Sequence, residues 1–321
     1  MKAVECTKYG GVEFLKLVET EKPSPKENEV LIKNHATSVT SGDARIRRAD
    51  PFIIRLIFGF KKPRKPVLGV VVAGEVEAVG TSVTKFKVGD QVFGSAGMNF
   101  GAHAEYVSVS EDAVLALKPS NLSYQEAAAI PFGATAALHF IKIANIQPDQ
   151  NVLIYGASGA LGTMAIQLAK NQGATVTAVC SSANAAMVRG LGADKTIDYT
   201  LEDFTKNGET YDVIFDTVGK APFWRALKSL HKKGHLLMAS AGMGLLVGSA
   251  IIAPFTSRNI SSGMIKTTAE DMHHIKQLLE KGKLKPVIDQ TYPLDQIALA
   301  HAYVDKGHKK GNVIISIFGG I

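Results

Sequence analysis

The chain of 321 residues contains only two cysteines, Cys6 and Cys180. Two cysteines are too few for a disulfide framework, and they cannot build a structural four-cysteine zinc site within one chain. Such scarcity is typical of proteins in a reducing compartment. We therefore expect a cytoplasmic protein, and its 46% apolar residues are enough for ordinary globular cores.

Long hydrophobic runs are also missing. The longest apolar stretches, residues 52–60 and 242–255, are shorter than the roughly 18 residues that a membrane-spanning helix needs. Residues 1–6 have the pattern of a short strand and lack the regions of an export signal. The sequence therefore predicts no integral membrane segment and no secretion.

The formal net charge is +7, but concentrated basic motifs are lacking. Short basic clusters at residues 61–65 and 306–310 contain neither interleaved aromatic residues nor a motif typical of nucleic-acid binding. We therefore expect no nucleic-acid partner. The charge excess is compatible with an anionic small molecule such as a phosphorylated cofactor.

Two different patterns divide the chain. Up to about residue 124, short β segments are separated by glycine and proline, which is typical of a β-barrel. From about residue 125, helical stretches alternate with six apolar strands, at residues 152–155, 175–179, 196–198, 213–216, 235–239 and 260–265. This alternation predicts an α/β region with a doubly wound parallel sheet. Residues 267–321 resemble a return to the first domain, so we expect segments 1–124, 125–266 and 267–321 to form two domains.

The most informative segment is residues 151–170, NVLIYGASGALGTMAIQLAK, in which a strand leads into a glycine-rich turn and an amphipathic helix. Gly159 would let the backbone approach a cofactor pyrophosphate, and Gly162 would let the helix pack closely on the sheet. The free N–H groups at the helix N-terminus would bind phosphate. Ala157 stands where the usual pattern has its first glycine. Glycine can also serve any strained turn, but the flanking strands favour dinucleotide binding.

The end of the next strand indicates which dinucleotide is bound. An acidic residue about 20 residues after the turn would bind the ribose 2′-hydroxyl of NAD and repel the 2′-phosphate of NADP. The sequence there is Cys180, Ser181, Ser182, Ala183, Asn184, without a carboxylate. Hydroxyl and amide groups can donate to phosphate oxygens, so NADP(H) is the expected cofactor. Serine and asparagine are also common helix caps, so one of them could have only that role.

Several segments, in a fixed order along the chain, carry a family resemblance. They are the glycine-rich turn together with PVLGVVVAGEVEAVGTSVTKFKVGDQVFG (66–94), AAAIPFGATAALHF (127–140), LGADKTIDY (191–199) and YDVIFDTVG (211–219). With them the chain resembles the medium-chain dehydrogenase/reductase superfamily, in particular its quinone oxidoreductase-like members. The resemblance covers nearly the full length. It implies a GroES-like β-barrel catalytic domain formed by both chain ends, with a Rossmann domain inserted between them.

The same resemblance implies a set of cofactor contacts. Thr135 would face the nicotinamide carboxamide. The other predicted contacts are Ser158, Gly159, Ala160 and Leu161 at the phosphate turn, Ser181, Asn184 and Tyr199 around the 2′-phosphate, and Val218, Ser240, Met264 and Asn312 along the rest of the groove. Many relatives have lysine at the position of Asn184, so the phosphate grip is expected to be weaker here or shared with other groups.

Two ligand positions of the zinc-dependent relatives are changed. Those relatives carry a cysteine where this chain has Thr40, and a Gly-His-Glu where it has Gly69, Val70 and Val71. Threonine and valine do not supply zinc ligands at this geometry, so we expect no metal site. Isolated histidines flanked by apolar residues are more often packed than ligating, and we interpret three in this way: His35, His103 and His139.

Without a metal or a covalent nucleophile, the expected reaction is hydride transfer from NADPH to a quinone or an α,β-unsaturated carbonyl. Such acceptors need only hydrogen-bond donors on their oxygen, whereas a saturated ketone needs stronger polarisation. In residues 36–47, ATSVTSGDARIR, Thr40 replaces an asparagine often found in relatives and is the predicted substrate contact. Asp43 and Arg47, four residues apart, are interpreted as a structural ion pair. No general acid can be named.

An alternative class is a protein that binds NADPH without turnover, acting at a membrane surface through residues 51–65, PFIIRLIFGFKKPRK. Apolar residues followed by a basic cluster suit an anionic interface. We prefer the interpretation that residues 52–60 form an apolar wall of the substrate pocket. The oligomeric state stays open, with a homodimer as one candidate.

Overall fold

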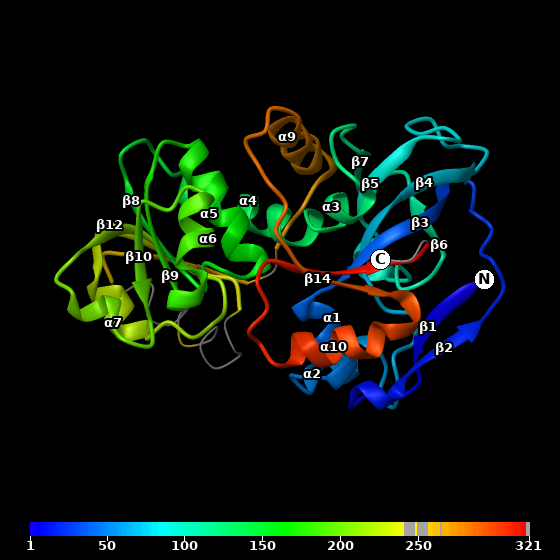
Figure 1. Ribbon diagram of the computed structural model, residues 1–321, viewed down its shortest axis with the longest axis horizontal. Coiled ribbons are helices and arrows are strands. Elements are labelled where there is room, and N and C mark those ends of the chain that lie inside the picture. Colours follow the sequence, from blue (N-terminus) through cyan, green and yellow to red (C-terminus); the bar gives the residue numbers. More distant parts are fainter. Residues whose placement is uncertain (241–247, 249–255, 264, 319–321) are drawn as a thin grey trace. The chain divides into compact units, whose positions relative to one another are not determined.

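The structure is a computed structural model that describes residues 1–240, 248, 256–263 and 265–318. Contacts within the chain divide it into two compact units (Figure 1). Unit 1 consists of Met1–Phe132, Thr268–Lys281 and Pro286–Ile321, and unit 2 of Gly133–Thr267 and Gly282–Lys285. Unit 1 continues past residue 125 because helix α3 (Tyr124–Ala128) packs against its strands β3 and β4.

Unit 1 is built around a seven-stranded, mostly antiparallel sheet. Its path is β14 (Ile288–Pro293), β15 (Asn312–Ser316), β3 (Glu29–Val39), β4 (Val71–Val79), β5 (Gln91–Ser95) and β7 (Val114–Leu117), with β6 (Tyr106–Ser110) also paired to β3. Strands β1 (Lys2–Cys6) and β2 (Leu15–Glu19) form a separate antiparallel pair. Val30 and Ile32 of β3 alternate into a core with Val72 and Val76 of β4, as the two-residue period of a strand requires.

Unit 1 also contains helices. They are α1 (Ser41–Arg48), α2 (Ile53–Phe58), α3, α9 (Ala269–Glu280) and α10 (Ile297–Asp305). Of these, α3, α9 and α10 pack against strands of this sheet. Short 3-10 helices occur in unit 1 at Val12–Phe14, Gly97–Asn99 and Leu294–Gln296, and in unit 2 at Ser182–Asn184 and Phe204–Lys206. Helix α10 packs on α1 and on strands β14 and β15. Unit 1 is therefore the GroES-like fold that the resemblance implied.

Unit 2 contains a six-stranded parallel sheet in the order β10-β9-β8-β11-β12-β13. The strands are β8 (Asn151–Tyr155), β9 (Thr175–Cys180), β10 (Lys195–Asp198), β11 (Tyr211–Asp216), β12 (Leu230–Met238) and β13 (Asn259–Ser262). The helices are α4 (Pro131–Ala144), which begins at the end of unit 1, α5 (Ala160–Asn171), α6 (Ala185–Gly190) and α7 (Phe223–Lys228). All six predicted strands are present, which confirms the Rossmann-type sheet.

The strand order of unit 2 indicates where a ligand would bind. The chain starts in the centre at β8, moves outward through β9 and β10, and then returns to the other side of β8 with β11. This reversal is a topological switch point, and ligands of such sheets bind at the carboxyl ends of the strands beside it. In the described part of the chain, no helix is long and apolar enough to cross a membrane.

Candidate cofactor and substrate sites

Two glycines, Gly156 and Gly162, shape the turn between β8 and α5. Gly156 has φ of 78°, and a Cβ there would lie 2.7 Å from Thr217 Oγ1. A Cβ on Gly162 would lie 2.3 Å from the carbonyl oxygen of Gly156. The tight turn and the close helix packing therefore require these two glycines. Gly156, not the neighbouring Ala157, supplies the left-handed residue of the turn.

Gly159 is different, because the fold does not require glycine there. Its φ of −79° is open to any residue, and the nearest atom to an added Cβ would be the Gly156 carbonyl oxygen at 3.7 Å. The surface beside the Gly159 backbone is consequently open. A glycine that the protein itself does not need fits the close approach of a ligand to the main chain.

The N-terminus of α5 continues this open surface. Gly159 is its N-cap residue, and no side chain caps the helix. The N–H groups that begin an α-helix have no partner within it, and they carry the positive end of the helix dipole. The predicted phosphate-turn residues Ser158, Gly159, Ala160 and Leu161 therefore surround a place that suits an anion.

The loop after β11 lies against the same turn. Asp216 ends β11 and accepts hydrogen bonds from the N–H groups of Val218 (3.0 Å) and Gly219 (2.8 Å). A Cβ on Gly156 would meet the Val218 side chain at 2.7 Å, and one on Gly219 would meet the carbonyl oxygen of Ser240 at 2.2 Å. The structure thus brings Val218 and Ser240 together with the phosphate turn, at the carboxyl ends of β8, β11 and β12.

A cavity of about 210 Å³ opens at the carboxyl ends of β9 and β10. Its lining residues are Cys180, Ser181, Ser182, Ala185, Arg189, Thr196, Ile197 and Asp198. Arg189 was not among the predicted residues, yet its guanidinium is the positive group of this lining. Its Nη2 donates to Thr196 Oγ1 at 2.6 Å, which holds the side chain over the cavity. Ala185 and Arg189 are four residues apart on α6, so they lie on the same face of that helix. Arg189 is the basic residue of α6, and a search for a cation in the helix after Asn184 could have found it.

The cavity also contains a carboxylate, Asp198, at the end of β10. One carboxylate oxygen accepts from the N–H and hydroxyl groups of Ser182, and the other from the N–H and hydroxyl groups of Thr200. The hydrogen bonds from Ser182 and Thr200 hold the pKa of Asp198 below its usual range. Both oxygens are already engaged, so Asp198 orders the loop and has little capacity left for a ribose hydroxyl.

Ser181 and Asn184 do not act as side-chain helix caps. Ser181 precedes the short helix Ser182–Asn184 and Asn184 precedes α6, and neither side chain caps its helix. The amide of Asn184 donates to Ser181 Oγ at 3.2 Å, which fixes the two side chains relative to each other. Tyr199, about half exposed, follows Asp198 at the same edge of the sheet. These positions leave Ser181 and Tyr199 available to a ligand.

Two other predicted cofactor contacts, Thr135 and Asn312, lie elsewhere in the fold. Thr135 is buried on α4, and that helix contacts the start of α5, since a Cβ on Gly133 would lie 2.3 Å from the carbonyl oxygen of Ala160. Asn312 belongs to β15 of unit 1, where its side-chain amide donates to the carbonyl oxygen of Val287 at 3.1 Å. Met264 lies outside the described residues.

The predicted substrate contact, Thr40, is buried at the N-cap of α1. Its hydroxyl accepts from the N–H of Asp43 at 3.1 Å and donates to Asp43 Oδ2 at 2.6 Å. The N–H of Thr40 also donates to Asp43 Oδ2, at 2.8 Å, which completes a capping box. The hydroxyl hydrogen of Thr40 is therefore already used by the protein.

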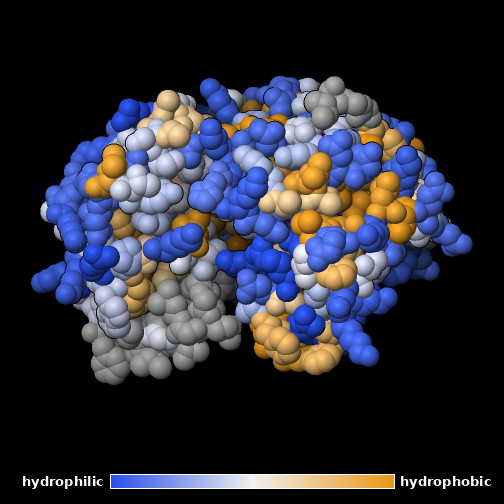
Figure 2. Space-filling view, turned by 60° about the horizontal axis from the view of Figure 1, so that its bottom comes forward, coloured by the Kyte–Doolittle hydropathy of each residue, from blue (hydrophilic) through white to orange (hydrophobic). Residues whose placement is uncertain are grey.

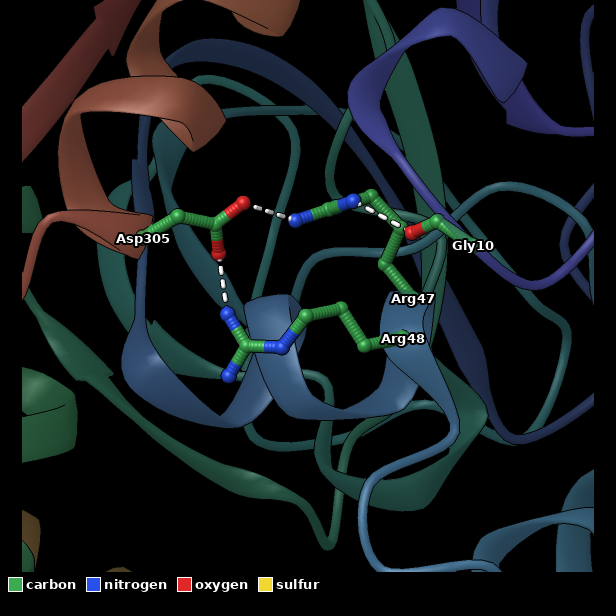
Figure 3. A network of polar contacts seen from close by, with 4 residues as sticks. All are labelled: Gly10, Arg47, Arg48 and Asp305. Atoms are coloured by element: carbon green, nitrogen blue, oxygen red, sulfur yellow. Dashed lines mark hydrogen bonds and ion pairs between the residues drawn. The ribbon is translucent and has the colours of Figure 1, made fainter.

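Arg47 pairs with a different acid from the one expected. Its fully buried guanidinium donates to the Gly10 carbonyl oxygen at 2.5 Å and forms an ion pair with Asp305, which also pairs with Arg48 (Figure 3). The interpretation of Asp43 and Arg47 as an ion pair is wrong, because Asp43 serves the helix cap while Arg47 points to α10. The network joins α1 to α10 and to the N-terminal loop, which holds the helix that carries Thr40.

The described residues do not fit a zinc ion. No three Cys, His, Asp or Glu side chains gather in a metal-binding arrangement in the part of the chain that the structure describes. At the positions of the zinc ligands, Thr40 is engaged with Asp43, and Val71 is fully buried in β4. His103 lies against Gly69, since a Cβ on Gly69 would be 2.4 Å from its ring.

His103 forms a buried pair with His301, a residue that the sequence did not single out. Their ring centroids are 5.6 Å apart, and both imidazoles are fully buried. Burial lowers the pKa of both imidazoles, that of His301 well below its ordinary value. His35 packs differently, stacking on Tyr124 with a centroid distance of 4.3 Å. These contacts support packed histidines.

Comparisons with known proteins agree with this arrangement. Residues 26–119 match the alcohol dehydrogenase GroES-like domain family, and residues 191–315 match the zinc-binding dehydrogenase family. The chain is 35% identical to a 2-methylene-furan-3-one reductase of Solanum lycopersicum, over 98% of this chain and 79% of that protein. It is 32% identical to an NADPH-dependent alkenal/one oxidoreductase of Arabidopsis thaliana, with the same coverage.

A solved structure is similar over the full length. The quinone oxidoreductase from Coxiella burnetii has a TM-score of 0.90 and 30% sequence identity, and the match covers 99% of each chain. The family models, the relatives and the solved structure therefore all indicate the family that the sequence segments had suggested. The chain belongs to the quinone oxidoreductase-like family of the medium-chain dehydrogenase/reductase superfamily, whose members include NAD(P)H-dependent quinone and alkenal oxidoreductases.

Proposed function

We propose that this protein is an NADPH-dependent, zinc-independent reductase that delivers hydride to an α,β-unsaturated carbonyl compound or a quinone. The observation that carries the proposal is the open surface at Gly159. Unit 2 places a glycine that its own fold does not need beside an uncapped helix N-terminus, at the switch point of a parallel sheet. These are the requirements for binding a dinucleotide pyrophosphate.

The preference for NADP(H) rests on the cavity beside Ser181. A 2′-phosphate placed there would meet the guanidinium of Arg189 and the hydroxyl of Ser181. A guanidinium suits phosphate because its planar donors can form two charge-assisted hydrogen bonds. The carboxylate of Asp198 opposes an anion, but its four hydrogen bonds from Ser182 and Thr200 spread its charge. Arg189 would then supply the cation that lysine provides in relatives at the position of Asn184.

The remaining cofactor contacts follow the residues already described. Ser158, Gly159, Ala160 and Leu161 would hold the pyrophosphate, and Asn184 and Tyr199 would support the 2′-phosphate. Thr135 would face the nicotinamide carboxamide, and Val218, Ser240, Met264 and Asn312 would line the rest of the cofactor groove. When bound, the reduced nicotinamide supplies the hydride, and the chain positions it and excludes water.

Thr40 is the proposed substrate contact. Its hydroxyl would donate to the substrate oxygen, where negative charge develops as hydride arrives. Because that hydroxyl donates to Asp43 in the structure, it must rotate away from the carboxylate to serve the substrate. A conjugated acceptor suits this modest donor, since it needs less polarisation than a saturated ketone. The tomato and Arabidopsis relatives are named for conjugated carbonyl substrates, which supports this choice.

A substrate screen with NADPH tests the proposal. Quinones, 2-alkenals and cyclic enones should oxidise NADPH, whereas simple alcohols with NADP⁺ should give no reaction, and chelator should leave the rates unchanged. Elemental analysis should find no stoichiometric zinc. One zinc per chain, or activity confined to alcohols, would refute the proposed chemistry. NADPH binding with complete inactivity toward every acceptor would instead identify a binding protein without turnover.

A further inference from the structure

An apolar patch on unit 1 is not used by the proposed function. It consists of Phe52, Ile53, Leu56, Ile57 and Phe60, on and beside α2, whose residues are between 42% and 65% exposed. We refer to it as the α2 patch. Figure 2 shows orange side chains at the lower edge of unit 1, with hydrophilic side chains in blue above them. Large apolar side chains exposed side by side usually mark an interaction surface.

The exposure of the patch results from ordered packing on its other side. Ile54, one residue into α2, is buried in a small core with Tyr9 and Ala49. The Phe58 ring packs edge-on against Phe100, with 5.4 Å between the centroids. The guanidinium of Arg55 lies 5.0 Å from the centre of the Tyr9 ring. One face of α2 is thus held by unit 1, which leaves the opposite face pointing outward.

The patch carries positive charge along its border and no negative charge within it. Residues 51–65 contain five basic side chains and no Asp or Glu: Arg55, Lys61, Lys62, Arg64 and Lys65. Lys61, Lys62, Arg64 and Lys65 are exposed. Gly59, with φ of 124°, lets the chain turn so that Arg64 returns to it, since a Cβ there would lie 3.2 Å from Arg64 Cγ. Apolar and basic groups therefore share one surface.

A pocket lining accounts for only part of the segment. A cavity of about 220 Å³ in unit 1 is lined by Ile57 and Phe58 together with Arg64 and Lys65. Phe52, Ile53, Leu56 and Phe60 are not in its lining. The expectation that the whole of residues 52–60 forms a pocket wall thus leaves four exposed apolar side chains unexplained.

We propose that the α2 patch docks this protein onto an anionic membrane surface. The apolar side chains would enter the boundary between headgroups and acyl chains, and the basic residues would contact the anionic headgroups. Charge complementarity favours this occupant over a second copy of the chain, because two copies meeting at the patch would oppose like charges. The proposal concerns residues outside the cofactor site and does not depend on the reaction.

Vesicle sedimentation of the full chain tests the contribution of the apolar side chains of the α2 patch. The protein should bind vesicles of phosphatidylcholine with 30% phosphatidylglycerol at low salt, and bind pure phosphatidylcholine vesicles at least tenfold more weakly. Replacing Phe52, Leu56 and Phe60 together by serine should reduce binding at least tenfold. The matched control replaces three apolar residues of similar exposure in other regions, Leu201, Trp224 and Leu299, by serine and should bind as the wild type does.

A second pair of variants tests the contribution of the basic side chains to vesicle binding. Each Lys or Arg near an anionic leaflet is worth about 1 kcal/mol, or about fivefold in partitioning. The double variant Lys61→Gln/Lys62→Gln should therefore bind about 25-fold more weakly at low salt. The control Lys228→Gln/Lys232→Gln removes two exposed charges of unit 2 and should change little.

A fluorescence experiment locates the contact. Trp224 is the only tryptophan and lies on α7 of unit 2, so Phe60→Trp in a Trp224→Phe background reports on the patch alone. Its emission should shift to the blue and be quenched by brominated lipid, while Trp224 of the wild type should not be quenched. Absence of binding to anionic vesicles would overturn the proposal, as would unchanged binding of the triple serine variant. A wild-type dimer that becomes monomeric in the triple serine variant, with no vesicle binding, would identify a second copy as the occupant.

Discussion

The helices of the two units begin in different ways. In unit 1, α1, α3 and α9 each start with a capping box, formed by Thr40 with Asp43, Ser123 with Glu126, and Thr268 with Asp271. In unit 2, α5, α6 and α7 start without any side-chain cap. Helices α2 and α10 of unit 1 are also uncapped.

The difference has a physical consequence. A capping box uses the N–H groups of the first helical turn within the protein, which stabilises the fold. An uncapped start leaves those N–H groups for another partner, and α5 starts at the switch point of the sheet. Three helices of unit 1 therefore use their first-turn N–H groups within the protein, whereas the uncapped start of α5 leaves its N–H groups for the phosphate that we propose to bind there.

The largest effect is expected for Gly159→Val. The valine side chain would occupy the space into which the cofactor pyrophosphate must come, so NADPH affinity should fall by at least 100-fold, or about 2.7 kcal/mol. The unfolding free energy should fall by less than about 1 kcal/mol, because the protein leaves this space open. Isothermal titration and thermal melting would measure both.

Gly190→Val is the matched control, since it adds the same side chain at a glycine of α6 with no atom within 4 Å. It should bind NADPH as the wild type does. Unchanged NADPH binding in Gly159→Val would show that the cofactor does not bind at this turn. The proposed difference between the helix starts of the two units would then have no functional meaning.

The second prediction concerns the choice of cofactor. The wild type should bind NADPH ten- to 100-fold more tightly than NADH, which corresponds to about 1.4 to 2.7 kcal/mol. In Ser181→Asp that preference should disappear or invert, because a carboxylate repels the 2′-phosphate and accepts from a 2′-hydroxyl. Direct titration of both cofactors checks it, and equal affinities in the wild type would contradict the assignment.

Arg189→Gln tests how much of the NADPH preference comes from the cation of Arg189, separately from the absence of a carboxylate at Ser181. It removes the cation from the cavity but adds no negative charge, so NADPH affinity should fall about tenfold while NADH affinity stays constant. An equal loss for both cofactors would show that Arg189 supports the loop structure and does not contact phosphate.

The third prediction is that unit 1 makes the protein sensitive to acid. His103 and His301 are neutral in the folded state because burial lowers their pKa, whereas in the unfolded chain they regain an ordinary value near 6.5. The unfolded state therefore binds more protons below pH 6.5, and stability is lost as the pH falls. His301, whose pKa is lowered well below its ordinary value, should contribute up to about 1.4 kcal/mol per pH unit below pH 6.5, and His103 should add to the loss in the same direction.

Denaturant unfolding at pH 7, 6 and 5 measures the slope of the unfolding free energy against pH. His301→Gln keeps a polar side chain but removes one titrating group, so its slope should be smaller by about 1.4 kcal/mol per pH unit. A variant with the full wild-type slope would mean that carboxylates cause the acid sensitivity.

The smallest effect is expected for Thr268→Ala, which removes the capping box of α9. The N–H of Asp271 loses its acceptor, and the unfolding free energy should fall by about 1 kcal/mol. Thr268→Ser keeps the hydroxyl and should restore stability. Neither change should alter NADPH binding. By contrast, Gly159→Ser should cap α5, stabilise it by only a few tenths of a kcal/mol and weaken NADPH binding.

Local patterns in the sequence were sufficient to predict the main secondary structure and the fold class of this protein. All six strands of unit 2 and the phosphate turn followed from apolar alternation and glycine spacing, because those signals arise between residues close in the chain. The family motifs added the GroES-like fold of unit 1. The substitutions at Thr40, Val70 and Val71 were likewise visible as residue types.

Contacts between distant residues were decided by the tertiary structure. Arg47 pairs with Asp305, 258 positions away, and no local spacing reveals that partner. Asp198 reaches the Ser181 cavity because β10 lies beside β9, a pairing that only the strand order specifies. The sequence also did not predict that the side chains of the α2 patch face outward. An apolar run of nine residues has the same pattern whether it covers a pocket or faces water. Burial depends on what packs against each face, and that is a property of the folded chain.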